Sequence, residues 1–294
     1  MKSQYEKKRL ITFDRIKIKS NYKYLLNTKV KFNEMFHSRS GKKIGIFYSS
    51  KDDINIPYNL YIAVSYIKQT LTLEFSSKIL KEKYPDLISR DTIKECLTNI
   101  NLLNICKIDI DGILSDGVDV TYDTNLILSD NLLDVLNSQV NNYRRFKWTH
   151  YDKEGIMFTK DVKSKDCTET IILYNKEKEI CTSHNKDFLN SLSQPQSIID
   201  YFKGKTRFEL TLDTPKKIMK YLNLTDTKIS SVLNSNTNPI LIQFDKVFGN
   251  STTNVPNATL DNYEEWSMKI ILDSYKGDLK RLEQDIRSKF SSRS

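Results

Sequence analysis

The chain has 294 residues and carries 46 lysine and arginine residues against 37 aspartate and glutamate residues, a formal net charge of +9. This length suffices for a substantial core, and the positive balance favours an anionic partner such as nucleic acid or an acidic membrane surface. No apolar run approaches the ~20 residues that cross a bilayer, and the chain has neither a Walker loop nor a GxGxxG motif.

Cysteine and histidine spacing limits the expected compartment and the expected kind of metal site. The four cysteines, Cys96, Cys106, Cys167 and Cys181, form no CxxC pair, and the sequence shows no secretory signal. We therefore expect reduced, buried thiols in a cytoplasmic protein. The three histidines form neither an HxH nor an HExxH pair, so a metal site built from histidines is not expected.

Apolar and polar residues alternate in four segments of the N-terminal part, which predicts strands. These segments are residues 10–19, 44–49, 58–66 and 70–75. In the last of them the leucine and phenylalanine side chains share one face, and Glu74 lies on the other. Glu74 is therefore expected on the polar face of a sheet.

A helix and a further strand are predicted next. Ser89–Leu103 has apolar residues at helical spacing, and Ser89 is a suitable N-cap. Residues 105–112 then alternate again, with Asp109 and Asp111 on the polar side of the expected strand.

Cations and aromatic rings are interleaved in residues 141–153. Arg144, Arg145 and Lys147 supply positive charge, and Trp148 is one of several rings between them. Cations for phosphates beside rings for bases are the ingredients of a groove for single-stranded nucleic acid. An amphipathic strand with a solvated face explains the same pattern equally well, and both readings stay open.

Two strands are predicted within residues 168–212, at 171–179 and 206–212. Strand alternation places Tyr174 and Lys176 on the same side of the first strand, opposite its apolar edge. In the second strand Arg207 and Glu209 share the polar face. A tyrosine, a lysine and a carboxylate are therefore expected together on the open face of a sheet.

The pattern changes after residue 212. Two short helices are predicted at 214–222 and 225–233, and a long amphipathic helix at 260–290. We expect an α+β fold with a largely antiparallel central sheet and flanking helices in residues 1–212. A mostly helical region, accessory or used for dimerisation, is expected in residues 213–294. No internal repeat is visible in the sequence.

The expected strands suggest one chemistry if their polar residues converge. Carboxylates of Glu74, Asp109 and Glu209 would hold Mg²⁺ or Mn²⁺ against a phosphodiester. The Tyr174 hydroxyl would attack the phosphorus and form a covalent phosphotyrosyl link, with Lys176 beside it. Each residue by itself is a weak signal, since a strand tyrosine or glutamate is commonly an ordinary surface position.

The same blocks resemble the trans-acting Rep proteins that initiate rolling-circle replication of plasmids and phages. That family carries Arg-Ile-Glu-Phe, then Arg-Leu-Asp-Leu after a helix, then Arg-Ile-Tyr-Asn-Lys-x-x-Glu, and then Arg-Val-Glu. This chain has, in the same order, Thr72-Leu73-Glu74-Phe75, Lys107-Ile108-Asp109-Ile110, Ile172-Leu173-Tyr174-Asn175-Lys176-Glu177-Lys178-Glu179 and Arg207-Phe208-Glu209. The resemblance covers residues 60–212, and the Tyr-Asn-Lys-x-x-Glu block is its most specific part.

The resemblance implies a Rep nickase-like fold and a metal-dependent nickase. Such an enzyme cuts one strand at a replication origin hairpin, stays on the 5′ end through Tyr174, leaves a 3′-OH and later rejoins the strand. Glu74 and Asp109 are then the implied ligands of Mg²⁺ or Mn²⁺, with Asp111 and Glu179 as alternatives. The implied partners are origin DNA, a helicase and a polymerase of the host, and a second copy of the chain in a homodimer.

This chain departs from the family pattern at several positions. Thr72, Lys107 and Ile172 stand where the family has arginine, and the family's second aspartate, four residues after the first, falls at Ile113. The alternative function is a basic replication or regulatory protein that binds DNA without cutting it. In that case Tyr174 stacks or packs, and the acids pair with neighbouring cations such as Arg207.

Overall fold

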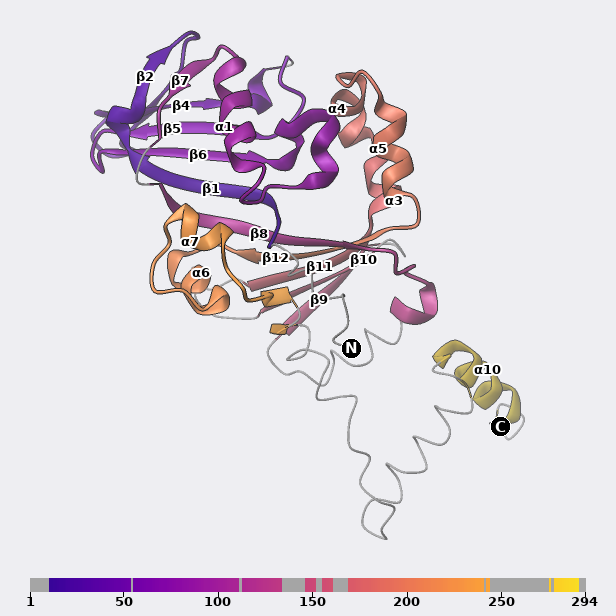
Figure 1. The fold of residues 1–294 in the computed structure, drawn as a ribbon. Helices are drawn as coiled ribbons and strands as arrows, with labels where there is room; N and C mark the ends of the chain where they lie inside the picture. Colours follow the sequence, from indigo (N-terminus) through magenta and orange to yellow (C-terminus); the bar gives the residue numbers. More distant parts are fainter. Residues whose placement is uncertain are drawn as a thin grey trace, which may run out of the picture.

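The computed structural model describes residues 11–53, 55–110, 113–133, 146–151, 155–160, 169–240, 242–243, 275 and 278–290. Within these residues ten strands form one antiparallel sheet, and several helices pack against it (Figure 1). The predicted α+β class with a largely antiparallel central sheet is confirmed.

The sheet is built from two meanders that meet at its centre. Its strands run in the order β3 (Asn33–Phe36), β4 (Lys43–Ser49), β5 (Leu60–Ser65), β6 (Thr70–Ser76), β1 (Phe13–Asn21), β8 (Leu114–Thr124), β12 (Thr206–Leu212), β11 (Glu169–Asn175), β10 (Gly155–Lys160) and β9 (Phe146–Tyr151). A separate two-stranded sheet pairs β2 (Leu25–Thr28) with β7 (Cys106–Ile108).

The two halves of the large sheet have the same connectivity, a repeat that the sequence does not show. In each half the first strand lies at the centre, and a four-stranded meander returns to pair with it: β3 to β6 return to β1, and β9 to β12 return to β8. The central strands β1 and β8 pair antiparallel. The halves are therefore related by an approximate two-fold axis between these strands.

The position of the two-fold axis follows from strand pairing. We match the two halves by placing β6 on β12 so that Glu74 corresponds to Glu209. Glu74 lies opposite Lys17 on β1, and Glu209 lies opposite Thr121 on β8. Two residues before each of these partners are Arg15 and Asp119, which lie opposite each other. The axis thus passes through an arginine–aspartate pair.

A single hydrophobic core contains buried residues from most of the described strands and helices. On the strands, buried and half-buried residues alternate, as in β6, because successive side chains point to opposite faces. The helices that cover the sheet are the 3-10 segment η3 (Ser77–Asp86), α1 (Ile93–Leu102), α3 (Lys176–Ile180), α4 (Lys186–Asn190), α5 (Pro195–Phe202), α6 (Pro215–Leu222) and α7 (Ile229–Leu233). The shorter helix α10 (Leu279–Phe290) lies within the predicted long helix. Burial of apolar surface against the sheet is the main force that holds these helices.

Two expected strands differ from the structure, and one observed strand was not expected. The strand predicted over residues 171–179 ends at Asn175, because the Asn175 side chain accepts from the Lys178 amide and caps α3. In the described part of the strand predicted over 105–112, which is residues 105–110, only Cys106–Ile108 form a strand, β7 of the small sheet. The central strand β8 was not predicted, although it pairs with both β1 and β12.

Helices α6 and α7 pack in the same core as the sheet, although a boundary was expected near residue 213. Thr214 caps α6 and Pro215 opens it, and Asn223 ends it in the left-handed conformation. The helix contacts β8 and β12 (Figure 1). Leu222 on α6 and Val232 on α7 both belong to the common core.

The described residues bear on two expectations, those on membrane spans and on thiols. Among these residues no helix combines the length and apolarity that crossing a bilayer requires. Cys96 and Cys106 are buried free thiols, Cys181 is an exposed free thiol, and Cys167 lies outside the described residues.

We expect Leu222→Ala to lower the free energy of unfolding by about 2–5 kcal/mol, because Leu222 is 1% exposed and its loss leaves a cavity. Urea denaturation measures the change. Leu102→Ala is the control, because Leu102 is 74% exposed and its replacement should cost little. A cost below about 1 kcal/mol for Leu222→Ala would mean that α6 is not part of the core.

Candidate active site

Tyr174 and Glu209 lie on neighbouring strands and share a hydrogen bond. In the β11–β12 register Tyr174 is opposite Arg207 and Ile172 is opposite Glu209, so tyrosine and glutamate are diagonal neighbours. The Tyr174 hydroxyl donates to Glu209 Oε1 at 2.8 Å. Both residues are half-buried. The sequence prediction that a phenol and a carboxylate meet on the sheet therefore agrees with the geometry.

Gly155 has no side chain, and this allows β10 and β11 to lie close together at Tyr174. Gly155 lies opposite Tyr174, and a Cβ atom on it would come within 2.4 Å of the Leu173 carbonyl oxygen and 2.7 Å of Tyr174 Cβ. Any larger residue would push the two strands apart, so glycine at this position helps to fix the place of the tyrosine.

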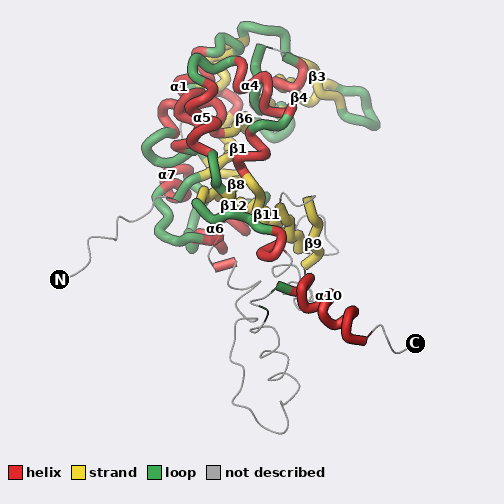
Figure 2. The backbone as a smooth tube through the Cα atoms, turned by 90° about the vertical axis from the view of Figure 1, so that its right-hand side faces the viewer, coloured by secondary structure: helices red, strands yellow, loops and turns green. Residues whose placement is uncertain are grey.

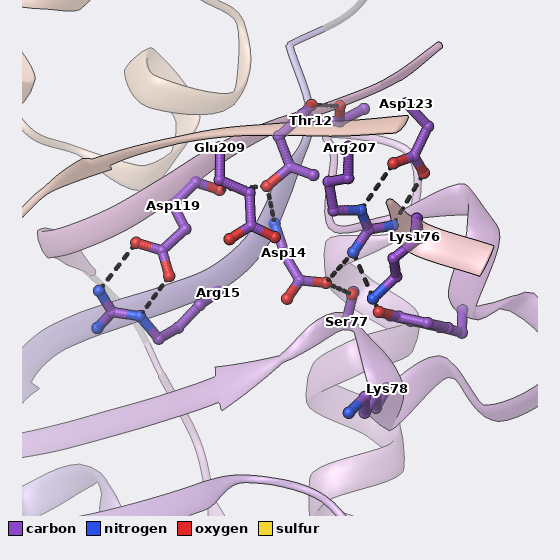
Figure 3. A network of polar contacts seen from close by, with 12 residues as sticks. Thr12, Asp14, Arg15, Ser77, Lys78, Asp119, Asp123, Lys176, Arg207 and Glu209 are labelled. Carbon is purple, nitrogen blue, oxygen red and sulfur yellow. Dashed lines mark hydrogen bonds and ion pairs between the residues drawn. The ribbon is translucent and has the colours of Figure 1, made fainter. Parts of the chain in front are cut away.

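Arg207 is completely buried and ties three strands together (Figure 3). Its guanidinium makes two hydrogen bonds to Asp123 on β8, at 2.7 and 2.8 Å, and one to Asp14 on β1, at 3.0 Å. It also donates to the Tyr84 hydroxyl on η3 at 3.0 Å. Arg207 was expected to bind DNA, but with no exposed surface it instead positions the strands and acids around it.

Lys176 reaches the same cluster from a helix and not from a strand. As the first residue of α3 it is 2% exposed, and its ammonium group pairs with Glu179 one helical turn later. The nitrogen lies 5.6 Å from the centre of the Tyr174 ring and 5.3 Å from that of the Tyr84 ring. Because Glu179 already pairs with this lysine, its role as an alternative metal ligand is not favoured.

Burial and charge shift the pKa values in this cluster in opposite directions. Burial, together with the negative charge of Asp14, raises the pKa of Glu209 to about 7. Burial also tends to raise the pKa of Asp14, but the charges of Arg207 and Lys176 hold it below its usual value. Glu209 is therefore a carboxyl group of this cluster that exchanges its proton near neutral pH.

The pKa values of the two possible proton donors, Tyr174 and Lys176, are shifted as well. Burial and the charge of Glu209 raise the pKa of Tyr174 well above its usual value. Burial and the charge of Arg207 lower the pKa of Lys176. A free phenolate is thus scarce, and the phenol can react only if a base removes its proton as the new bond forms.

Glu74 occupies the corresponding position in the other half but has a different partner. It accepts a hydrogen bond from Arg15 at 3.2 Å, and Arg15 also makes two hydrogen bonds to Asp119, at 2.7 and 3.0 Å. The arginine neutralises both acids in place of a metal ion. Figure 3 shows the Arg15–Asp119 pair beside the Arg207 cluster.

Asp109 lies outside the cluster. It is exposed at the end of β7 in the small sheet, where its amide donates to the Tyr24 carbonyl at 3.0 Å. Asp111 lies outside the described residues. Within the described part of the chain, no three acidic, histidine or cysteine side chains are grouped so that they could hold a metal ion. The predicted ligand set of Glu74, Asp109 and Glu209 is therefore not assembled, and the residues present do not fit a metal held in that way.

The predicted DNA-binding segment falls mostly outside what the structure describes. Arg144 and Arg145 lie outside the described residues, and so do the side chains of Lys147 and Trp148. The backbone places Lys147 and Trp148 on β9, opposite Thr159 and Phe158 of β10, at one edge of the sheet. A role of these four residues in binding DNA stays a prediction.

Sequence reasoning missed Asp14, Asp119 and Asp123, which the structure brings to the cluster. The signal was available in β8, because residues 118–123 alternate apolar and polar side chains and carry aspartates four residues apart. Asp14 gave no comparable signal, since its role depends on Arg207, which is distant in sequence.

Neither the scan against protein-family models nor the search of curated proteins gives a match for this chain. Membership of the Rep family therefore stays a prediction from the resemblance.

Glu209→Gln should change how stability depends on pH. Because the folded pKa of Glu209 is about 7 and the usual value is 4.5, the folded chain keeps a proton that the unfolded chain loses. The contribution of this group to the free energy of unfolding is fully present below pH 4.5 and is lost as pH rises through 7. Glutamine does not titrate, so the variant does not lose this stability as pH rises. Its side chain still accepts the hydrogen bond from Tyr174.

We expect the stability of Glu209→Gln relative to the parent chain to rise between pH 5 and 7 and to level off above pH 8, measured by urea unfolding at each pH. Glu283→Gln on the exposed helix α10 controls for the loss of one carboxylate. A stability difference that does not vary over this range would show that Glu209 titrates normally.

Proposed function

We propose that the protein is a DNA strand-transferase of the rolling-circle initiator kind, with a Rep nickase-like fold and Tyr174 as nucleophile. The observation that carries this proposal is the 2.8 Å hydrogen bond from the Tyr174 hydroxyl to Glu209, whose pKa is raised to about 7. A phenol beside a carboxylate that exchanges its proton near neutral pH is a nucleophile with an adjacent general base, which is one way to activate attack on a phosphodiester.

The steps follow from these two groups. Glu209 takes the phenolic proton while the Tyr174 oxygen attacks the scissile phosphorus. The bond from phosphorus to the 3′ oxygen breaks, and that oxygen gains a proton from solvent and leaves as the 3′-OH of the upstream fragment. The downstream fragment remains linked through its 5′ phosphate as a phosphotyrosyl ester. Attack by a 3′-OH on the same ester reverses the steps and rejoins the strand.

The buried cations support this site from behind. Arg207 and Lys176 are too deeply buried to contact bound DNA. Their charges nevertheless lie beside the acids and the phenol. Arg207 lowers the pKa of both Tyr174 and Glu209, against the larger effect of burial. We assign both residues to positioning and electrostatic tuning of the site.

A divalent cation enters only through the resemblance. Since Asp14, Asp119 and Asp123 are all paired with arginine, no step above is routed through a metal ion. Mg²⁺ or Mn²⁺ stays a prediction that the assay below tests by adding each ion or EDTA.

The alternative function, DNA binding without cleavage, is favoured by one observation. Burial and the charge of Glu209 raise the pKa of Tyr174 well above its usual value, which would suit a packing tyrosine. Covalent attachment to DNA separates the two functions, because only the strand-transferase forms it.

We expect the wild-type chain to become covalently linked to single-stranded DNA from a random-sequence pool labelled at the 3′ end. Denaturing gel electrophoresis detects the link, and a 5′-labelled pool should instead give free fragments with a 3′-OH. Tyr174→Phe should reduce the covalent product to background, because the phenyl ring has no attacking oxygen. Tyr66→Phe is the control, since Tyr66 is 43% exposed and lies outside the cluster.

Covalent product that persists in Tyr174→Phe would assign the nucleophile to another tyrosine. If the wild-type chain forms none with Mg²⁺, Mn²⁺ or EDTA present, the strand-transferase proposal falls. Product in Mg²⁺ or Mn²⁺ but not in EDTA would support the metal that the resemblance implies.

Glu209→Gln should slow formation of the covalent product by about 10²–10⁴-fold without weakening DNA binding, because the amide cannot accept the phenolic proton. Single-turnover rates against pH measure the effect, and the parent rate should rise with an apparent pKa near 7. A variant with the parent's rate and pH profile would remove Glu209 from the proton transfer.

A further inference from the structure

A β-bulge interrupts the central strand β1 at Asp14. Phe13 lies opposite Val120 on β8 and Arg15 lies opposite Asp119, so Asp14 is an extra residue in the pairing of the two strands. Figure 2 shows β1 between β6 and β8 in the row of strands. The bulge therefore lies where the two halves of the sheet meet.

The bulge brings two consecutive residues to the polar face of the sheet. Phe13 and Ile16, on either side of them, are completely buried in the core, whereas Asp14 and Arg15 are both half-buried. Arg15 belongs to the ion pair on the two-fold axis, and Asp14 pairs with Arg207. In a regular strand only one of two consecutive side chains could point to this face.

The Asp14 carboxylate is anchored next to Glu209. Its Oδ1 atom accepts hydrogen bonds from Arg207 at 3.0 Å and from the Ser77 hydroxyl at 2.6 Å. Its backbone amide donates to Thr121 Oγ1 at 3.1 Å, and Thr121 lies opposite Glu209 in the β8–β12 pairing. In Figure 3 the Asp14 carboxylate points toward Arg207 and Ser77, with Glu209 on its other side. The bulge thus places a fixed carboxylate beside the acid that contacts Tyr174.

The surrounding charges determine which of the two acids holds a proton. Burial tends to raise the pKa of Asp14, but the charges of Arg207 and Lys176 hold it below its usual value, so Asp14 is ionised near neutral pH. Burial and the charge of Asp14 raise the pKa of Glu209 to about 7, and Asp14 has the largest effect among the neighbouring charges. The charged and titratable groups that face Glu209 are Asp14 on β1, Tyr84 on η3, Asp119 on β8, Tyr174 on β11, Lys176 on α3 and Arg207 on β12.

We propose that Asp14 is a positioning residue of this site, whose carboxylate anchors Arg207 from β1 and keeps on Glu209 a proton that an isolated glutamate would release. Asp14 acts through these two residues and exchanges no proton with Tyr174 itself. Its part in strand transfer rests on the proposed function, whereas its effect on Glu209 does not.

Asp14→Asn separates the charge of this residue from its anchoring contacts, because asparagine keeps the Oδ1 atom that accepts from Arg207 and Ser77. In the full chain labelled with ¹³C at glutamate, nuclear magnetic resonance should show an apparent pKa of Glu209 that is lower than the parent's value of about 7. The expected decrease is about 1 or more, because one negative charge is gone and Arg207 has one acid fewer to neutralise. The curve of covalent-product rate against pH should move to lower pH by the same amount.

Asp116→Asn is the matched control. Asp116 is the extra residue of a second bulge, on β8, and it pairs with Lys19 at 2.7 Å. Its side chain is 16% exposed, against 22% for Asp14. Five residues separate it from Thr121, which lies opposite Glu209, and at ~3.4 Å per residue this is about 17 Å. That separation exceeds the Debye length of ~8 Å at physiological salt, so the titration of Glu209 should not change.

An unchanged titration of Glu209 in Asp14→Asn would overturn the proposal, even if the rate falls, because Asp14 would then have only a structural role. An equal change in both variants would also overturn it.

If Asp14→Asn does not fold, the parent chain labelled with ¹³C at aspartate supplies the test. The Asp14 carboxyl should titrate below its usual value, and titration near pH 7 would show that Asp14 holds the proton in place of Glu209. A lowered pKa of Glu209 in Asp14→Asn, with no covalent product from the parent chain, would uphold the effect of Asp14 while the strand-transferase proposal falls.

Discussion

The buried guanidinium of Arg207 is the interaction on which the centre of this structure depends. It connects β12 with Asp14 on β1, Asp123 on β8 and Tyr84 on η3, at a point where the two halves of the sheet meet. A buried arginine is stable only if its charge and hydrogen bonds are matched, and two carboxylates and a phenol supply that match here. The strand that carries Glu209 is therefore tied to β1, β8 and η3 by a polar contact inside the fold.

The repeat explains why one half can carry a reactive site and the other a structural pair. With Glu74 aligned to Glu209, Thr72 and Ala63 stand at the positions of Arg207 and Tyr174. The N-terminal half thus lacks both the buried cation and the phenol. Its glutamate is instead neutralised by Arg15, beside the axis. Two halves with one connectivity therefore hold their glutamates in different electrostatic surroundings.

Local sequence patterns predicted the elements whose burial alternates regularly. β6 and β12 were placed within a residue or two because their apolar residues recur at every second position. The position of Lys176 was not predictable in this way, since Asn175 switches the chain from strand to helix by capping. The partners of Arg207 come from strands far away in sequence, and a pattern within one segment carries no information about them. The Tyr174–Glu209 contact was predictable because both residues stand on recognisable strands that pair directly.

The most direct test of the central claim is the titration of the Glu209 carboxyl carbon, followed by nuclear magnetic resonance of the protein labelled with ¹³C at glutamate and assigned with Glu209→Gln. The account predicts an apparent pKa of about 7, produced by burial and the neighbouring charge of Asp14. A carboxyl group that titrates near 4.5 would contradict it. The carboxylate would then be an ordinary acid, unsuited to exchanging a proton with the phenol near neutral pH.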